Sequence, residues 1–157
     1  MSIPNQASDQ ASPLPIHAEH VSALVRFFET LTRDNAAQVA AIYATDARFK
    51  DPFNEVQGLD AIQHLFAHMF NQVKNPRFKI TAAVQQREQV FLTWDFFFRM
   101  PPFASSEQCI RGATHFHLAE DGRVIYHRDY WDAAEELYEK LPLVGLFMRG
   151  LKRFARQ

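Results

Sequence analysis

The chain has 157 residues and a formal net charge of −1 at pH 7, so nothing in its overall charge favours nucleic acid or an anionic membrane as a partner. Hydrophobic residues make up 47% and charged residues 22%, which is typical of one soluble globular domain. The single cysteine, Cys109, excludes an internal disulfide. The sequence has no apolar run near the roughly 20 residues that span a bilayer. This absence and the single cysteine favour a cytoplasmic protein.

The N-terminal half predicts a tail followed by helices. Residues 1–16 are rich in Ser, Gln, Pro and Ala and lack the basic and apolar regions of a signal peptide. We therefore expect a flexible tail there and a single domain at 17–157. Apolar residues recur at helical spacing over 17–34. Asn35, with a glutamine three residues later, has the pattern of a capping pair that starts a short second helix, and a third helix is expected after Gly58.

The C-terminal half predicts strands, because after Pro76 the apolar period changes from 3.6 to 2. Asp132 and Glu135 have the spacing of a capping pair for a helix after the last strand. Residues 143–156 combine apolar and basic positions, and we favour a helix that packs on the domain over one that binds a membrane. The expected strands are 78–84, 90–100, 108–118 and 124–131.

This order of elements predicts the fold class. Helices followed by consecutive antiparallel strands are typical of an α+β fold. A curved antiparallel sheet wrapped over three N-terminal helices, with an extra C-terminal helix, would form a cone with an apolar mouth. Pockets favour such concave places.

Asp51 has an unusual setting for an acidic residue, because Phe49, Pro52 and Phe53 surround it in the sequence. Loss of contact with water penalises the charged form of a carboxyl group and raises its pKa. We therefore expect this side chain to exchange protons nearer neutral pH than a surface carboxylate does. The alternative is that Asp51 caps a turn before Pro52.

Two stretches carry a resemblance to known families. The run Tyr-Ala-Thr-Asp-Ala-Arg-Phe-Lys-Asp-Pro-Phe at 43–53 resembles the ketosteroid isomerases, which belong to the nuclear transport factor 2-like, or SnoaL-like, superfamily. Asp51 matches their general base. The run Gly-Arg-Val-Ile-Tyr-His-Arg-Asp-Tyr-Trp-Asp at 122–132 is similar to the last strand of the limonene epoxide hydrolases. There Asp129 matches the acid that deprotonates the attacking water, and the resemblance implies Asp95 as its partner.

Strand alternation then predicts which residues share a cavity. If Asp129 faces the interior, so does His127, and an inward Asp95 brings Thr93 and Phe97 with it. Carboxylates in one apolar cavity repel each other, and this repulsion raises the pKa of at least one of them. One carboxyl group can then act as an acid and another as a base, without a metal. The expected catalytic residues are Asp51, Asp95, Asp129 and, as an auxiliary, His127. The expected ligand-binding residues are Phe27, Phe49, Phe53, Phe97, Thr114, Phe116 and Trp131.

The same alternation predicts an aromatic outer face. If Asp95 points inward, then Trp94, Phe96 and Phe98 point outward, on the same face as Tyr130. Four aromatic side chains of about 150–250 Å² each make a larger apolar patch than a soluble monomer usually exposes. We therefore predict a homodimer through this face, and the superfamily that the chain resembles commonly dimerises in this way.

Two functions are consistent with these residues. The first is a cofactor-independent isomerase, cyclase or hydrolase that acts on a small hydrophobic molecule by aspartate acid/base chemistry. The second is a non-catalytic module of the same fold that binds a small molecule or a protein. The second function is supported by the positions that match the oxyanion donors of the isomerases, because they hold Phe27 and Thr114. No cofactor is expected, and no metal, because His64 and His68 lack a third ligand.

Overall fold

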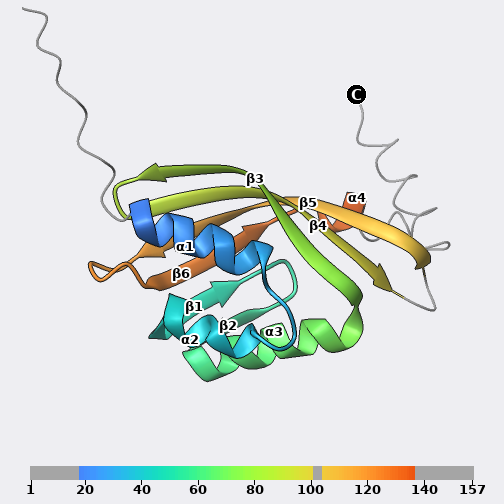
Figure 1. Ribbon diagram of the computed structural model, residues 1–157, viewed down its shortest axis with the longest axis horizontal. Helices are drawn as coiled ribbons and strands as arrows, with labels where there is room; N and C mark the ends of the chain where they lie inside the picture. The colour runs from blue at the N-terminus through green and yellow to red at the C-terminus, as the bar shows by residue number, and fades with distance from the viewer. Residues whose placement is uncertain (1–17, 101–103, 137–157) are drawn as a thin grey trace, which may run out of the picture.

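The computed structural model describes residues 18–100 and 104–136 (Figure 1). The expected tail at 1–16 and the expected helix at 143–156 lie outside these residues. No helix in the described ranges combines the length and the apolar character that crossing a membrane requires.

Three short or medium helices precede a set of long strands, in the predicted order. The helical elements are α1 (Ala18–Glu29), the 3₁₀ turn η1 (Ala36–Gln38), α2 (Val39–Ile42), α3 (Leu59–Gln72) and α4 (Ala133–Glu136). The strands are β1 (Tyr43–Lys50), β2 (Glu55–Gln57), β3 (Lys74–Gln86), β4 (Gln89–Met100), β5 (Ala104–Leu118) and β6 (Val124–Tyr130).

The six strands form one curved, open sheet with the order β2-β1-β6-β5-β4-β3. Helices α1, α2 and α3 lie on its concave side, as Figure 1 shows, so the expected α+β cone is confirmed. The sheet is mixed rather than wholly antiparallel, because β1 runs parallel to β6 while all other neighbours are antiparallel. The first strand thus pairs with the last one, and this pairing brings the motif around Asp51 beside the motif around Asp129.

Local sequence signals explain most of the element boundaries. Gly58 adopts φ +96°, which favours glycine, and α3 begins at the next residue. The backbone N–H of Glu135 donates to the Asp132 carboxylate at 3.1 Å, so the predicted cap of the last helix is confirmed. The predicted cap at Asn35 is wrong: its side chain makes no cap hydrogen bond and instead bonds to the backbone of Thr30 and Thr32. It closes the turn after α1 rather than the start of the next helix.

The core fills the space between the helices and the concave face of the sheet. Phe28 of α1 lies at its centre, with its ring centroid 5.8 Å from that of Phe78, 5.8 Å from that of Phe116 and 5.9 Å from that of His127. On the far side Phe66 of α3 closes against the same ring at 6.2 Å. This aromatic packing buries the base of the cone and leaves a cavity toward one end of it.

Candidate active site

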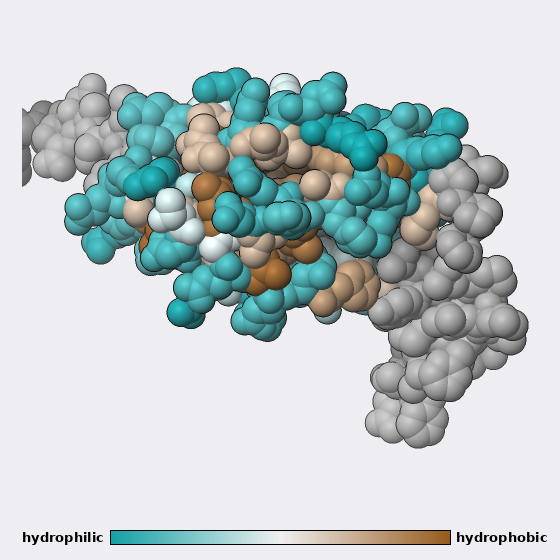
Figure 2. Space-filling model, turned by 90° about the horizontal axis from the view of Figure 1, so that it is seen from below, coloured by the Kyte–Doolittle hydropathy of each residue, from teal (hydrophilic) through white to brown (hydrophobic). Residues whose placement is uncertain are grey.

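A cavity of about 430 Å³ lies between the concave face of the sheet and helices α1 and α3. This volume is in the range of small-molecule sites. Figure 2 shows the helical side of the molecule, where hydrophobic residues appear between hydrophilic ones. Ten phenylalanine and tryptophan side chains line the cavity: Phe28, Phe49, Phe53, Phe66, Phe78, Trp94, Phe96, Phe98, Phe116 and Trp131.

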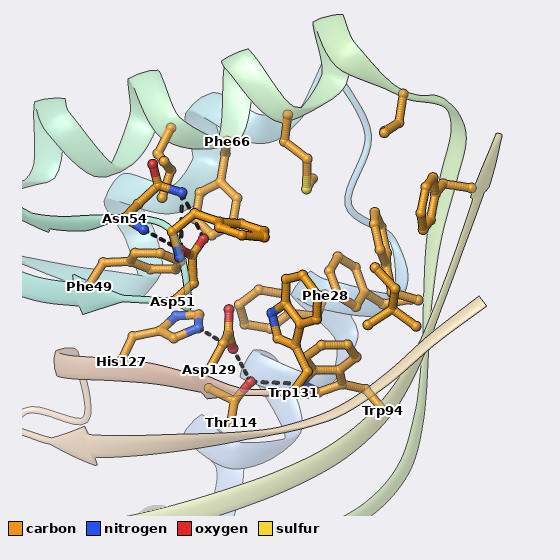
Figure 3. A pocket seen from close by; sticks show the side chains of 18 of the residues that line it. Phe28, Phe49, Asp51, Asn54, Phe66, Trp94, Thr114, His127, Asp129 and Trp131 are labelled. Carbon is orange, nitrogen blue, oxygen red and sulfur yellow. Dashed lines mark hydrogen bonds and ion pairs between the residues drawn. The ribbon is translucent and has the colours of Figure 1, made fainter. Parts of the chain in front are cut away.

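A chain of hydrogen bonds crosses the polar end of this cavity and is centred on Asp129 (Figure 3). Trp94 Nε1 donates to Thr114 Oγ1 at 2.8 Å, and Thr114 Oγ1 donates to Asp129 Oδ1 at 2.5 Å. His127 Nε2 lies 2.9 Å from the same carboxylate oxygen. The other ring nitrogen, Nδ1, lies 2.5 Å from the hydroxyl oxygen of Tyr43. Side chains from four strands, β1, β4, β5 and β6, are therefore joined in one hydrogen-bonded chain around this carboxylate.

The chemistry of these groups indicates the direction of the hydrogen bonds. An indole N–H can only donate, so Thr114 accepts from Trp94 and gives its own proton to Asp129. Burial, and secondarily the charge of Asp129, raise the pKa of Tyr43 well above its ordinary range. The phenol therefore keeps its proton and can donate it to Nδ1 of His127. In the tautomer that this bond favours, the imidazole carries its proton on Nε2 and donates to Asp129.

The donors in this arrangement are buried. Tyr43 and His127 are 0% and 1% exposed, and Thr114 is 3% exposed. Both donors to Asp129 converge on Oδ1, and among the described residues no group bonds to Oδ2. In Figure 3 the second oxygen is turned away from Thr114, into the space that the lining side chains enclose. Asp129 thus presents one oriented, accessible oxygen to the cavity.

Asp51 also lines the cavity, but its carboxylate closes a turn. Its Oδ1 accepts from the backbone N–H groups of Phe53 at 2.7 Å and Asn54 at 2.5 Å. The side-chain amide of Asn54 contacts both oxygens, at 3.1 and 3.0 Å. These bonds hold the four-residue loop that joins β1 to β2. The alternative interpretation of Asp51, as the cap of a turn, is therefore the one that the geometry supports.

Most of the residues expected in the cavity do line it. His127, Asp129 and Trp131 face inward from β6 and the residue after it, as the alternation predicts. Thr114 and Phe116 face inward from β5. Phe49 of β1 and Phe53 of the following loop also line the cavity, and the Phe53 ring meets that of Trp131 edge to face at 5.4 Å.

The expected orientation of β4 is wrong. Leu92 and Trp94 line the cavity, whereas Asp95 and Phe97 are on the outer face. Each residue of β4 shares a face with its partner on β5, and Leu92 pairs with Thr114, which is inside. The strand has aromatic residues at both alternations, so period alone does not choose between them. Burial of the wholly apolar alternation wins, and it leaves the charged residue in contact with solvent.

Asp95 therefore does not belong to the carboxylate pair that was expected. Its side chain lies 4.0 Å from the guanidinium of Arg111, its cross-strand neighbour. Phe97 packs under the guanidinium of Arg77, with 4.4 Å between the cation and the ring centroid. Phe27 is also absent from the cavity lining: it is 7% exposed and packs edge to face on Phe28, which takes the place expected of it.

The outer face consequently differs from the expected one. Trp94, Phe96 and Phe98 are 7%, 9% and 4% exposed and lie inside, so they do not form a surface patch. Tyr130 is on the outer face as expected, at 47% exposure, and Phe91 joins it at 46%. A homodimer through this face stays a prediction, and it now rests on a smaller aromatic surface.

Sequence reasoning missed several residues that build the site. Phe28 follows the apolar stripe of α1, and Trp94 follows the wholly apolar alternation of β4, so both carried a usable signal. Tyr43 and Asn54 carried none. Tyr43 meets His127 only through the parallel pairing of β1 with β6. Asn54 takes its role from the local turn that Asp51 closes.

Fold and site together define an α+β cone with an apolar cavity and an internal acid. The sequence matches the SnoaL-like domain family over residues 24–127, and the chain belongs to that family. A search of curated protein sequences found no match.

Solved structures show the same fold at low sequence identity. A protein from Catenulispora acidiphila with a ketosteroid isomerase-like fold, in complex with trimethylamine, is 18% identical, with a TM-score of 0.68 over 80% of this chain and 95% of that one. An epoxide hydrolase of Mycobacterium tuberculosis that resembles limonene epoxide hydrolase is 19% identical, with a TM-score of 0.67 over 88% and 95%. A SnoaL-like polyketide cyclase from Jannaschia is 17% identical, with a TM-score of 0.63 over 77% and 90%.

Proposed function

We propose that this protein is a cofactor-independent enzyme that moves a proton on a small, mostly apolar molecule, with Asp129 as the general base. The observation that carries the proposal is the asymmetric environment of this carboxylate. Thr114 and His127 occupy Oδ1, and Oδ2 is left open toward the cavity. A general base needs an oriented acceptor within reach of its substrate and shielded from bulk water.

The hydrogen-bonded chain gives each neighbour a role. Thr114 and His127 hold the plane of the carboxylate, so that Oδ2 does not rotate away from the substrate. Tyr43 holds the imidazole of His127 in the tautomer that donates to Asp129. These three are positioning residues, because the open carboxylate oxygen of this hydrogen-bonded chain belongs to Asp129.

The reaction class follows from what one base can do. Asp129 takes a proton at Oδ2 from a carbon acid or from a water molecule. It then returns that proton to another atom of the substrate, or to the alkoxide that forms when an epoxide opens. Isomerisation, cyclisation and hydrolysis all share this pair of steps. The similarity in fold to a polyketide cyclase and an epoxide hydrolase is consistent with this range.

One observation favours a second candidate, a binding module without catalysis. The expected group of three carboxylates is not assembled, because Asp95 is on the outer face and the Asp51 carboxylate closes a turn. A single base without a clear acidic partner fits a cavity that only binds its ligand. The two candidates differ in what removal of the Asp129 charge does to turnover.

Turnover by the full chain tests the proposal. Apolar epoxides are assayed for hydration, and enolisable ketones for exchange of carbon-bound hydrogen in D₂O. For any compound that reacts, we expect Asp129→Asn to lower kcat/KM by about 10²–10⁴-fold, the usual contribution of a general base. Asp95→Asn, a matched loss of charge on the outer face, should leave it unchanged. Full activity of Asp129→Asn contradicts the proposal, and ligand binding without turnover of any compound supports the binding module.

A further inference from the structure

The charge of the cavity differs from that of an ordinary apolar pocket. Asp51 and Asp129 both line it, and each accepts hydrogen bonds from N–H or O–H donors. Among the described residues that line the cavity there is no lysine and no arginine. The imidazoles in the lining are those of His68, which bonds to Gln72, and of His127, which bonds to Asp129. The polar end of the cavity therefore holds two carboxylates with no ammonium or guanidinium group in its described lining.

The cationic side chains that are nearest in sequence to the two carboxylates have partners outside the cavity. Lys50 bonds to Glu55, its neighbour on β2. Arg128 lies over the ring of Tyr130, with 4.8 Å between the guanidinium carbon and the ring centroid. It alternates with His127 and Asp129, which face inward. Both side chains line an open groove that Asp51 and Asp129 also border, but neither lines the cavity itself.

The remaining walls are suited to a positive ligand. The faces of aromatic rings attract cations, and the attraction is strongest where water is excluded. Phe49 lies on β1, two residues before Asp51, and Trp131 comes two residues after Asp129. In Figure 3 the ring of Phe49 and the indole of Trp131 lie on either side of the space near the two carboxylates. Aromatic walls beside two carboxylates are the chemistry that recognises an alkylated ammonium group.

We propose that this cavity selects an apolar molecule that carries a positively charged amine or quaternary ammonium group, with the cation beside Asp51 and Asp129 and the apolar body in the aromatic part. The inference rests on the proposed function in so far as both use the same cavity, and it names the class of ligand. It does not require turnover. An anionic ligand of the same shape is excluded by the same charges, because a buried like-charge contact is unfavourable.

Two probes of matched shape test the proposal. (4-Hydroxyphenyl)trimethylammonium and 4-tert-butylphenol differ only in a nitrogen for a carbon, and so in one charge. Binding to the full chain is followed by NMR at the indole N–H signals of Trp94 and Trp131, the two tryptophans of the chain, which both line the cavity. We expect the cation to bind about tenfold more tightly, or better.

Three variants assign this preference to the cavity. Asp129→Asn and Asp51→Asn each remove one charge and keep an oxygen acceptor, and we expect the ratio of the two dissociation constants to fall toward one in both. Asp95→Asn removes the same charge from the outer face, and the ratio should keep its original value. Equal or tighter binding of the neutral probe overturns the proposal. So does failure of both probes to bind, or an equal fall of the ratio in Asp95→Asn.

The outcomes also separate this inference from the proposed function. A clear preference for the cation, with no turnover of any compound, supports the ligand class and contradicts the enzyme. Turnover of neutral compounds that depends on Asp129, with no preference for the cationic probe, supports the enzyme and contradicts the ligand class.

Discussion

The two carboxylates that face the cavity, Asp51 and Asp129, are held in different ways. Asp51 bonds to the backbone and side chain of residues two and three positions further along the chain. Asp129 bonds to Thr114 and to His127 of its own strand, and through them to Trp94 and Tyr43. Thr114, Trp94 and Tyr43 belong to three other strands. One carboxylate is fixed by local turn chemistry, and the other by tertiary packing.

This difference shows how aromatic neighbours in a sequence can mislead. Asp51 is surrounded by aromatic residues in the chain, yet its donors are the N–H groups of its own turn. Asp129 lies between an arginine and two aromatic residues, and the fold places it beside buried side chains. A carboxylate held by distant groups is sensitive to changes far from it. One held by its own turn is sensitive to changes nearby.

Gly112→Ala should break the network around Asp129 at its far end. Gly112 pairs with Trp94 across β4 and β5, and a Cβ there would lie 2.4 Å from the indole ring. The ring must move, and overpacking of this kind destabilises a core by about 1–3 kcal/mol. Chemical denaturation measures the loss of stability, and the indole N–H signal of Trp94 should shift as its bond to Thr114 is disturbed.

A second background controls this result. In a Trp94→Phe protein the smaller ring leaves room for the added methyl group, so Gly112→Ala should have a smaller effect on the free energy of unfolding. Equal losses in both backgrounds would mean that the ring is not the source of the strain.

Tyr43→Phe tests the other end of the network through its pH dependence. Burial and the charge of Asp129 raise the pKa of Tyr43 in the folded protein well above its ordinary value of 10.0. The stabilisation from this shift is complete below the unfolded-state pKa and is lost as the pH rises toward the folded-state pKa. The free energy of unfolding should therefore fall above about pH 10, by up to about 1.4 kcal/mol per pH unit for this one proton.

The variant has no phenol proton, so its stability should fall less steeply over the same alkaline range. Urea denaturation of both proteins at several values from about pH 9 to pH 11 compares the two slopes. Slopes that coincide would contradict the burial and the proton assignment of Tyr43.

The sequence predicted the fold because the signals for it are local. The change of period after Pro76, the helix after Gly58 and the cap at Asp132 each depend on a few adjacent residues. The inward alternation of β6 was also predicted, since His127 and Asp129 share one parity. The parallel pairing of β1 with β6 was not predicted, because nothing within a strand indicates which strand lies beside it.

The site was predicted less completely, for the same reason. Asp95 was assigned to the cavity by its match to a family motif, but the wholly apolar alternation that contains Trp94 had the stronger claim to burial. Choosing between the two alternations requires the pairing of Leu92 with Thr114, which only the structure supplies. Tyr43 became part of the site through a contact with a residue 84 positions away.

Asp51→Ala should have the smallest effect of the three variants and sharpens the contrast between the two carboxylates. The change removes the acceptor for two backbone N–H groups, and water can replace part of the loss because this turn is at the surface. We expect a loss of about 1 kcal/mol in the free energy of unfolding, measured by denaturation. Asp51→Asn keeps one oxygen acceptor and should lose less. If alanine and asparagine destabilise the protein equally, the negative charge rather than the turn is what Asp51 contributes, and the two carboxylates are more alike than their contacts indicate.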